Sequence, residues 1–140
     1  MRSARVVAKV LPVWLAQLSE WHGTRVARLD EVPDAALADL AADGFDTLWL
    51  VGVWERSVAS REIKRLQGMR AELGSAYAVH DHVVAASLGG EEALERLRER
   101  AARHGIRLAA DMVANHTALD SRWVEEHPDR FVQVPEPPFP

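Results

Sequence analysis

The segment Ile106-Arg107-Leu108-Ala109-Ala110-Asp111-Met112-Val113 decides the fold of this chain. It follows Gly105, a residue type that commonly ends helices, and it is apolar enough for a strand buried on both faces. Polar side chains follow at its carboxyl end, namely Asp111, Asn115 and His116. Because α/β proteins bind ligands beyond the carboxyl ends of parallel strands, this segment predicts a binding site on a parallel-sheet scaffold.

Length and composition limit what the chain can be. With 140 residues, 48% of them hydrophobic, it can bury one core but is much shorter than the roughly 250 residues of a complete (β/α)8 barrel. The net charge is −4 and the Lys and Arg residues are interleaved with acids, so we expect neither nucleic acid nor a membrane as partner. The chain has no cysteine, and its apolar run Val6–Leu18 shows no signal-peptide pattern, so we expect a cytoplasmic location.

Helices and strands alternate in the predicted structure. The predicted elements are a strand at 5–11, a helix at 30–44, a strand at 45–51, a helix at 89–105 and a strand at 106–113. Glu92 with Arg96 and Glu99 with Arg103 are spaced to form ion pairs on the later helix. This order is typical of successive βα units, which strongly favour right-handed parallel connections.

The connection between Gly52 and Leu88 is too long for a simple βα loop, so we expect it to be functional or to contain elements of its own. A short helix is predicted at 61–73. Tyr77, the only tyrosine, is followed by His80, Asp81 and His82. Two imidazoles around an acid raise the possibility of a zinc site, but no third ligand lies at a recognisable distance, which favours hydrogen-bonding roles.

Several other features have competing interpretations. Trp49 lies within a predicted buried strand and is expected in the core, whereas Trp54, beyond its end, is better placed to meet a ligand. The Arg28-Leu29-Asp30 sequence could seat a nucleophilic carboxylate, but it directly precedes a helix, so capping explains Asp30 better. On spacing alone, Asp111 could equally pair with an arginine and Asn115 could form a turn. His116 could equally be a polar residue whose hydrogen bonds are satisfied within the fold.

Taken together, these segments resemble the alpha-amylase superfamily, glycoside hydrolase family 13, over roughly residues 30 to 134. The matching segments are Asp111–His116, Tyr77 with Asp81, Leu88-Gly89-Gly90, His104-Gly105-Ile106 and Gly44–Leu50. The first has the family's Asp-x-Val-x-Asn-His pattern. The chain departs from the family where Gly52-Val53-Trp54 replaces the usual proline after the second strand, and where His82 replaces a common aromatic residue.

The resemblance implies a role for each matching residue. His116 would hydrogen-bond the sugar at the cleavage subsite, and Tyr77 would stack against that sugar. Asp111 and Asp81 would orient the substrate-binding site through hydrogen bonds, in the family typically to an arginine. Asn115 would be a calcium ligand in members that bind calcium, so calcium is the cofactor that the resemblance implies.

The resemblance also implies an α/β fold in which this chain is a partial (β/α)8 TIM barrel of about the first three βα units. We therefore expect residues 1–140 to be an N-terminal fragment of a glycoside hydrolase catalytic domain. Residues 1–29 would be a lead-in with a possible first strand, and the proline-rich residues 135–140 a truncated loop.

Family catalysis requires carboxylates after the fourth, fifth and seventh strands, which we expect to lie beyond this chain. We thus expect no catalytic residue here, although the family's activity is retaining cleavage or transfer on alpha-glucans and related oligosaccharides. The chain alone would be inactive. The alternative is a non-catalytic glycan-binding or interaction module.

Overall fold

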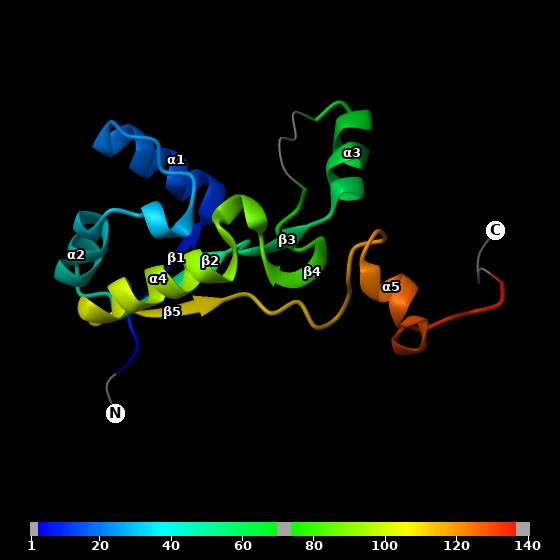
Figure 1. Cartoon of the computed structure of the whole chain (residues 1–140). Coiled ribbons are helices and arrows are strands. Elements are labelled where there is room, and N and C mark those ends of the chain that lie inside the picture. Colours follow the sequence, from blue (N-terminus) through cyan, green and yellow to red (C-terminus); the bar gives the residue numbers. More distant parts are fainter. Residues whose placement is uncertain (1–2, 70–73, 137–140) are drawn as a thin grey trace. The chain divides into compact units, whose positions relative to one another are not determined.

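A parallel sheet of three strands is the centre of the first of two compact units. The computed structural model describes residues 3–69 and 74–136. The first unit comprises residues 1–55 and 82–112, and the second comprises residues 56–81 and 113–140. In order across the sheet, the strands are β1 (Val6–Val10), β2 (Thr47–Val51) and β5 (Arg107–Ala110) (Figure 1).

The central strand β2 determines which face of the sheet is buried. Leu48 pairs in register with Val7 of β1 and Leu108 of β5. Leu48 and Leu50 are fully buried, whereas Trp49 between them is 40% exposed. Successive side chains of a strand point to opposite faces, so the two leucines occupy the core face and Trp49 the other. The expectation that Trp49 belongs to the core is therefore wrong.

Three helices supply much of the rest of this core. They are α1 (Leu11–His22), α2 (Asp34–Ala42) and α4 (Gly90–Arg103), and α4 lies along β5 (Figure 1). Ala93, Leu97 and Ala101 form the buried stripe of α4, with the expected Leu94 only partly buried. Each fully buried leucine contributes about 2 kcal/mol. The predicted partial barrel of about three βα units is confirmed, and α1, which the sequence analysis did not anticipate, follows β1 directly.

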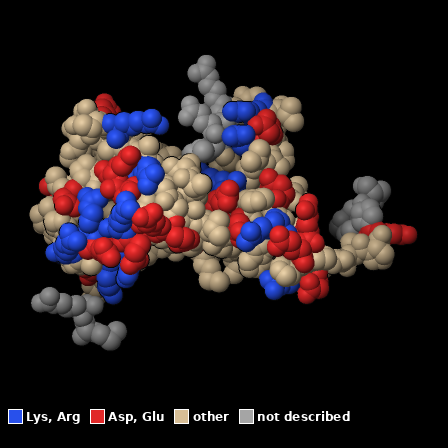
Figure 2. Space-filling view, viewed as in Figure 1, with Lys and Arg blue, Asp and Glu red and all other residues tan. Residues whose placement is uncertain are grey.

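Charged side chains cover the outer surface of α4 and of the residues that precede α2. Arg96 pairs with both Glu92 and Asp30, Arg98 pairs with Glu95, and Arg100 pairs with Asp34. Blue and red side chains are accordingly intermixed on this part of the molecule (Figure 2). The expected Glu92–Arg96 pair is present, whereas on this helix the second observed pair joins Glu95 to Arg98 rather than Glu99 to Arg103.

The helix predicted to begin at Asp30 is divided in two. Residues Leu29–Glu31 form a 3-10 helix, η1, and α2 begins only at Asp34. Val32 precedes Pro33, and the residue before a proline is disfavoured in the helical region. The capping role expected for Asp30 is wrong, because its carboxylate instead accepts hydrogen bonds from Arg28 (3.0 and 3.1 Å) and Arg96 (3.2 Å).

The predicted strands are longer than the observed ones. We expected strands at 45–51 and 106–113, and the observed strands begin at Thr47 and end at Ala110. Leu50 and Ala110 form the last pair of their ladder. Gly52 has a φ of 83°, a left-handed conformation that turns the chain out of the sheet, so β5 has no partner strand beyond that point.

The remaining elements are shorter. The first unit also contains η2 (Ala86–Leu88), and the strands β3 (Trp54–Arg56) and β4 (Val79–Val84) each include residues of both units. The second unit contains α3 (Val58–Leu66), α5 (Arg122–Glu126) and η3 (Pro128–Arg130). Neither β3 nor β4 is expected from the sequence pattern, and the two strands pair with each other. The pattern predicts α3 three residues late, at 61–73, where 70–73 lie outside the described residues, as do 137–140 of the proline-rich end. Across the described ranges, no helix combines the length and apolarity that crossing a membrane requires.

Candidate functional site

Asp111 is the buried acid of the first unit and lies just beyond β5. It is 8% exposed, and its carboxylate accepts hydrogen bonds from the indole Nε1 of Trp49 (2.9 Å) and the amide of Gly52 (3.2 Å). Its backbone carbonyl accepts a third from the indole Nε1 of Trp54 (2.5 Å). Asp111 therefore binds an indole and an amide at the end of β2, in place of the arginine that sequence reasoning suggested.

Trp54 has a structural environment rather than an open one. It is partly buried against the core, its indole N–H is donated to Asp111, and its ring centroid lies 5.7 Å from that of His82. The interpretation of Trp54 as a ligand-facing residue therefore finds no support in its contacts. The side chain instead helps to fix the loop that leaves β2.

Asp81 is the buried acid of the second unit and holds the start of α5. It is 5% exposed, and it forms an ion pair with Arg122 (2.7 Å) and accepts a hydrogen bond from the indole Nε1 of Trp123 (3.1 Å). The hydroxyl of Ser121 also donates to the carbonyl of His80 (2.7 Å). These contacts fix residues 121–123 beside the first half of β4, and Asp81 does pair with an arginine.

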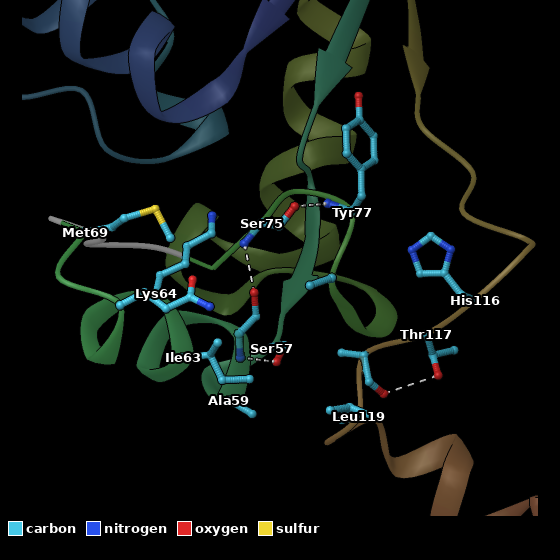
Figure 3. Close-up of a pocket in the computed structure, with 14 residues that line it drawn as sticks. Ser57, Ala59, Ile63, Lys64, Met69, Ser75, Tyr77, His116, Thr117 and Leu119 are labelled. Carbon is cyan, nitrogen blue, oxygen red and sulfur yellow. Dashed lines mark hydrogen bonds between the residues drawn. The ribbon is translucent and has the colours of Figure 1, made fainter. Parts of the chain in front are cut away.

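A cavity of about 450 Å³ lies within the second unit, between α3 and the segments 75–78 and 116–119. Tyr77, which is 51% exposed, and the exposed His116 both line it. In Figure 3 the rings of Tyr77 and His116 extend from two different segments, with Lys64 and Met69 on the opposite side of the view. The structure therefore brings Tyr77 and His116 to one cavity, within the size range of small-ligand sites.

The other residues singled out from the sequence do not line this cavity. Asp81 is buried against Arg122 at the start of α5, and Asp111 belongs to the first unit. Asn115 is exposed, and its amide nitrogen lies 3.4 Å from Nδ1 of His116. No group of three or more His, Cys, Asp or Glu side chains within 3–69 and 74–136 is arranged to hold a metal ion.

Hydrogen bonds at the start of α3 shape the cavity. The buried Ser57 caps the helix by accepting from the amide of Ser60 (2.8 Å), and its own amide donates to the carbonyl of Ala78 (2.9 Å). Asp120 accepts from the amide of Ala59 (3.0 Å). Sequence reasoning missed both residues. A serine directly before a helical segment is the signal that could have identified Ser57.

The pKa of Asp120 is lowered from its ordinary value. Burial raises this pKa, but hydrogen bonds from the Ala59 amide and the Ser57 hydroxyl stabilise the carboxylate and outweigh that effect. A carboxyl whose pKa is lower in the folded state stabilises the protein above its unfolded pKa of about 4. This contribution is lost as the pH falls through the folded value.

We expect Asp120→Asn to flatten the acid limb of the stability profile. At pH 7 the variant should lose about 1 kcal/mol of unfolding free energy, and near pH 3 its difference from the parent chain should shrink. Urea unfolding at pH 3, 5 and 7, monitored through the helical circular-dichroism signal, measures the stability difference at each pH. A constant difference across this range would show that the charge of Asp120 is not involved.

Comparison with known proteins identifies the chain's family. The family model "Alpha amylase, catalytic domain" matches residues 36–137, which is most of the chain. The chain belongs to the alpha-amylase family. Comparison with curated protein sequences gave no match.

Solved alpha-amylase structures share the fold. A noncanonic maltogenic alpha-amylase from Thermotoga neapolitana is 27% identical, with a TM-score of 0.62 over 73% of this chain and 23% of its own. An alpha-amylase from Lactobacillus plantarum is 22% identical, with a TM-score of 0.63. The match covers 94% of this chain and 27% of that enzyme. An alpha-amylase from Geobacillus thermoleovorans, complexed with acarbose, is 18% identical, with a TM-score of 0.55. The match covers 91% of this chain and 26% of that enzyme. The chain thus spans about a quarter of the length of these alpha-amylases.

Proposed function

We propose that this chain supplies part of the sugar-binding site of an alpha-glucan-active glycoside hydrolase or transglycosidase. The observation that carries the proposal is the cavity of the second unit, which Tyr77 and His116 both line. A flat ring that is half exposed beside a cavity can stack on the C–H face of a sugar. An exposed imidazole at the same cavity can exchange hydrogen bonds with sugar hydroxyls. Membership of the alpha-amylase family makes an oligosaccharide the first ligand to test.

The two buried acids have positioning roles in this proposal. Asp81 holds Arg122 and Trp123, and thereby the segment that follows the cavity-lining residues 116–119. Asp111 holds the end of β2. In retaining glycosidases two carboxyl groups about 5–5.5 Å apart act as nucleophile and acid/base. Because Asp81 and Asp111 are already engaged as acceptors, we assign neither of these catalytic roles to them.

Calcium binding through Asn115 remains a proposal of the family resemblance. Calcium takes 6–8 oxygen ligands in proteins, roughly, and Asn115 offers one side-chain oxygen. The described residues place no carboxylate cluster that would supply the others. No step of the proposed function involves the metal.

A non-catalytic glycan-binding module is the second candidate function. The described residues that line the cavity include no Asp or Glu, so sugar could bind there without any acid that could cleave it. Turnover by the chain would exclude the module, whereas sugar binding without turnover is expected of both candidates.

We expect Tyr77→Ala to weaken maltotriose binding to the 140-residue protein about tenfold, because the sugar loses its stacking ring. Tyr77→Phe, which keeps the ring, should bind nearly as well as the parent chain. Titration followed by NMR shifts of the amides at 75–78 and 116–119 measures the affinities. The matched control is Trp21→Ala, which removes an exposed ring from α1 in the first unit. Equal affinities for Tyr77→Ala and the parent chain would refute the proposed site.

A further inference from the structure

The described residues that line the cavity differ in charge from the chain as a whole. The chain has 21 acidic and 17 basic residues. Among the described residues that line the cavity, Lys64 is the sole Lys or Arg and none is acidic. A cation without a neighbouring carboxylate among these described residues favours an anionic ligand over a cationic one.

Lys64 lies on the side of α3 that lines the cavity, together with the apolar Ala59 and Ile63. Ser60 and Lys64 are four residues apart and share one side of the helix, Gln67 directly follows the helix, and all three line the cavity. The other two cations of this helix, Arg61 and Arg65, pair with Glu62 (3.3 and 3.1 Å). Within the described part of the chain, no carboxylate lies within ion-pair distance of Lys64.

The polar side chains on this side of the cavity combine one cation with further hydrogen-bond donors. The ammonium of Lys64 has three donors and no acceptor, Gln67 has an amide N–H₂, and Ser60 has a hydroxyl proton. A phosphate monoester offers only acceptor oxygens at neutral pH and carries a charge of about −1.5 to −2, which matches such a set.

We propose that this α3 face binds the phosphate group of a phosphorylated glucoside whose sugar ring lies against Tyr77 and His116. The inference rests on the proposed function for the position of the sugar, but the phosphate contacts are separate from it. The cavity of about 450 Å³ is large enough for a sugar phosphate, since small-ligand sites commonly measure about 300–1,000 Å³.

The test titrates the 140-residue protein with glucose, glucose 6-phosphate and inorganic phosphate at constant ionic strength. NMR shifts of the amides of α3 and of residues 116–119 report binding. We expect glucose 6-phosphate to bind at least tenfold more tightly than glucose, and more tightly than inorganic phosphate. Inorganic phosphate binding as tightly as glucose 6-phosphate would assign the face to free phosphate and overturn the glucoside.

Variants at Lys64 determine whether this residue is responsible. Lys64→Gln should remove the tenfold advantage of glucose 6-phosphate over glucose, and Lys64→Arg should retain it. The matched control is Arg65→Gln, which removes the same charge from the same turn of α3 at a position that does not line the cavity, and should change the affinity less than twofold. Undiminished glucose 6-phosphate binding by Lys64→Gln would overturn the inference.

The same titrations separate failure of the inference from failure of the proposed function. If Tyr77→Ala weakens glucose binding while Lys64→Gln leaves glucose 6-phosphate binding unchanged, the proposed function stands and the phosphate site is wrong. If Lys64→Gln removes phosphate-dependent binding while Tyr77→Ala changes nothing, the anion site stands and the sugar position is wrong.

Discussion

The 140-residue protein is expected to release no measurable sugar from soluble starch or from an activated maltoside. Glycoside cleavage of the retaining type requires a nucleophilic carboxylate and a carboxylic acid that protonates the leaving group. Asp81 is engaged by Arg122 and Trp123, and Asp111 by Trp49 and Gly52. Such acids are held as hydrogen-bond acceptors, which suits positioning roles rather than proton donation.

The assay compares the purified chain with an intact alpha-amylase at equal molar concentration, which should turn over readily under the same conditions. Activity that copurifies with the chain would exclude the binding-module candidate. If that activity also disappeared in an Asp111→Asn variant that unfolds at the same urea concentration as the parent chain, Asp111 would be a catalytic residue and its positioning role would be wrong. Sugar binding without turnover is the expected result.

The largest expected loss of stability follows from Asp111→Ala. The substitution removes the acceptor that the carboxylate provides to the buried Gly52 amide and to the Trp49 indole. Leaving a buried donor without its acceptor costs about 1–3 kcal/mol, and the lost packing adds to this. We expect a total of about 2–4 kcal/mol, a large part of the stability of a chain this size.

Urea unfolding and amide hydrogen exchange test this expectation together. Asp111→Ala should lower the urea midpoint and reduce the protection of the amides at the end of β2, including Val51. The matched control is Met112→Ala, next in sequence but 84% exposed, which should change stability by less than about 0.5 kcal/mol. If both variants unfolded at the same urea concentration, the contacts of Asp111 would contribute nothing to stability.

Local sequence patterns account for most of the sheet and for α4. Gly44 and Gly105 precede the strands β2 and β5, and apolar runs of the right length follow each of them. These signals are short-range, because helix ends and strand periodicity depend on residues a few positions apart. The ends of the elements were less predictable. Pro33 divided one predicted helix, and the left-handed Gly52 ended the pairing of β5 with β2.

The amino-acid sequence by itself determined the parallel α/β fold, the alpha-amylase family and the residue types at the candidate site. Only the tertiary structure decided that Tyr77 and His116 line one cavity, that Lys64 lines it too, and that Asp111 holds Trp49 and Gly52. The physical reason is separation along the chain. The contacts of Asp111 join residues about 60 positions apart, and such contacts depend on how whole elements pack rather than on any local pattern.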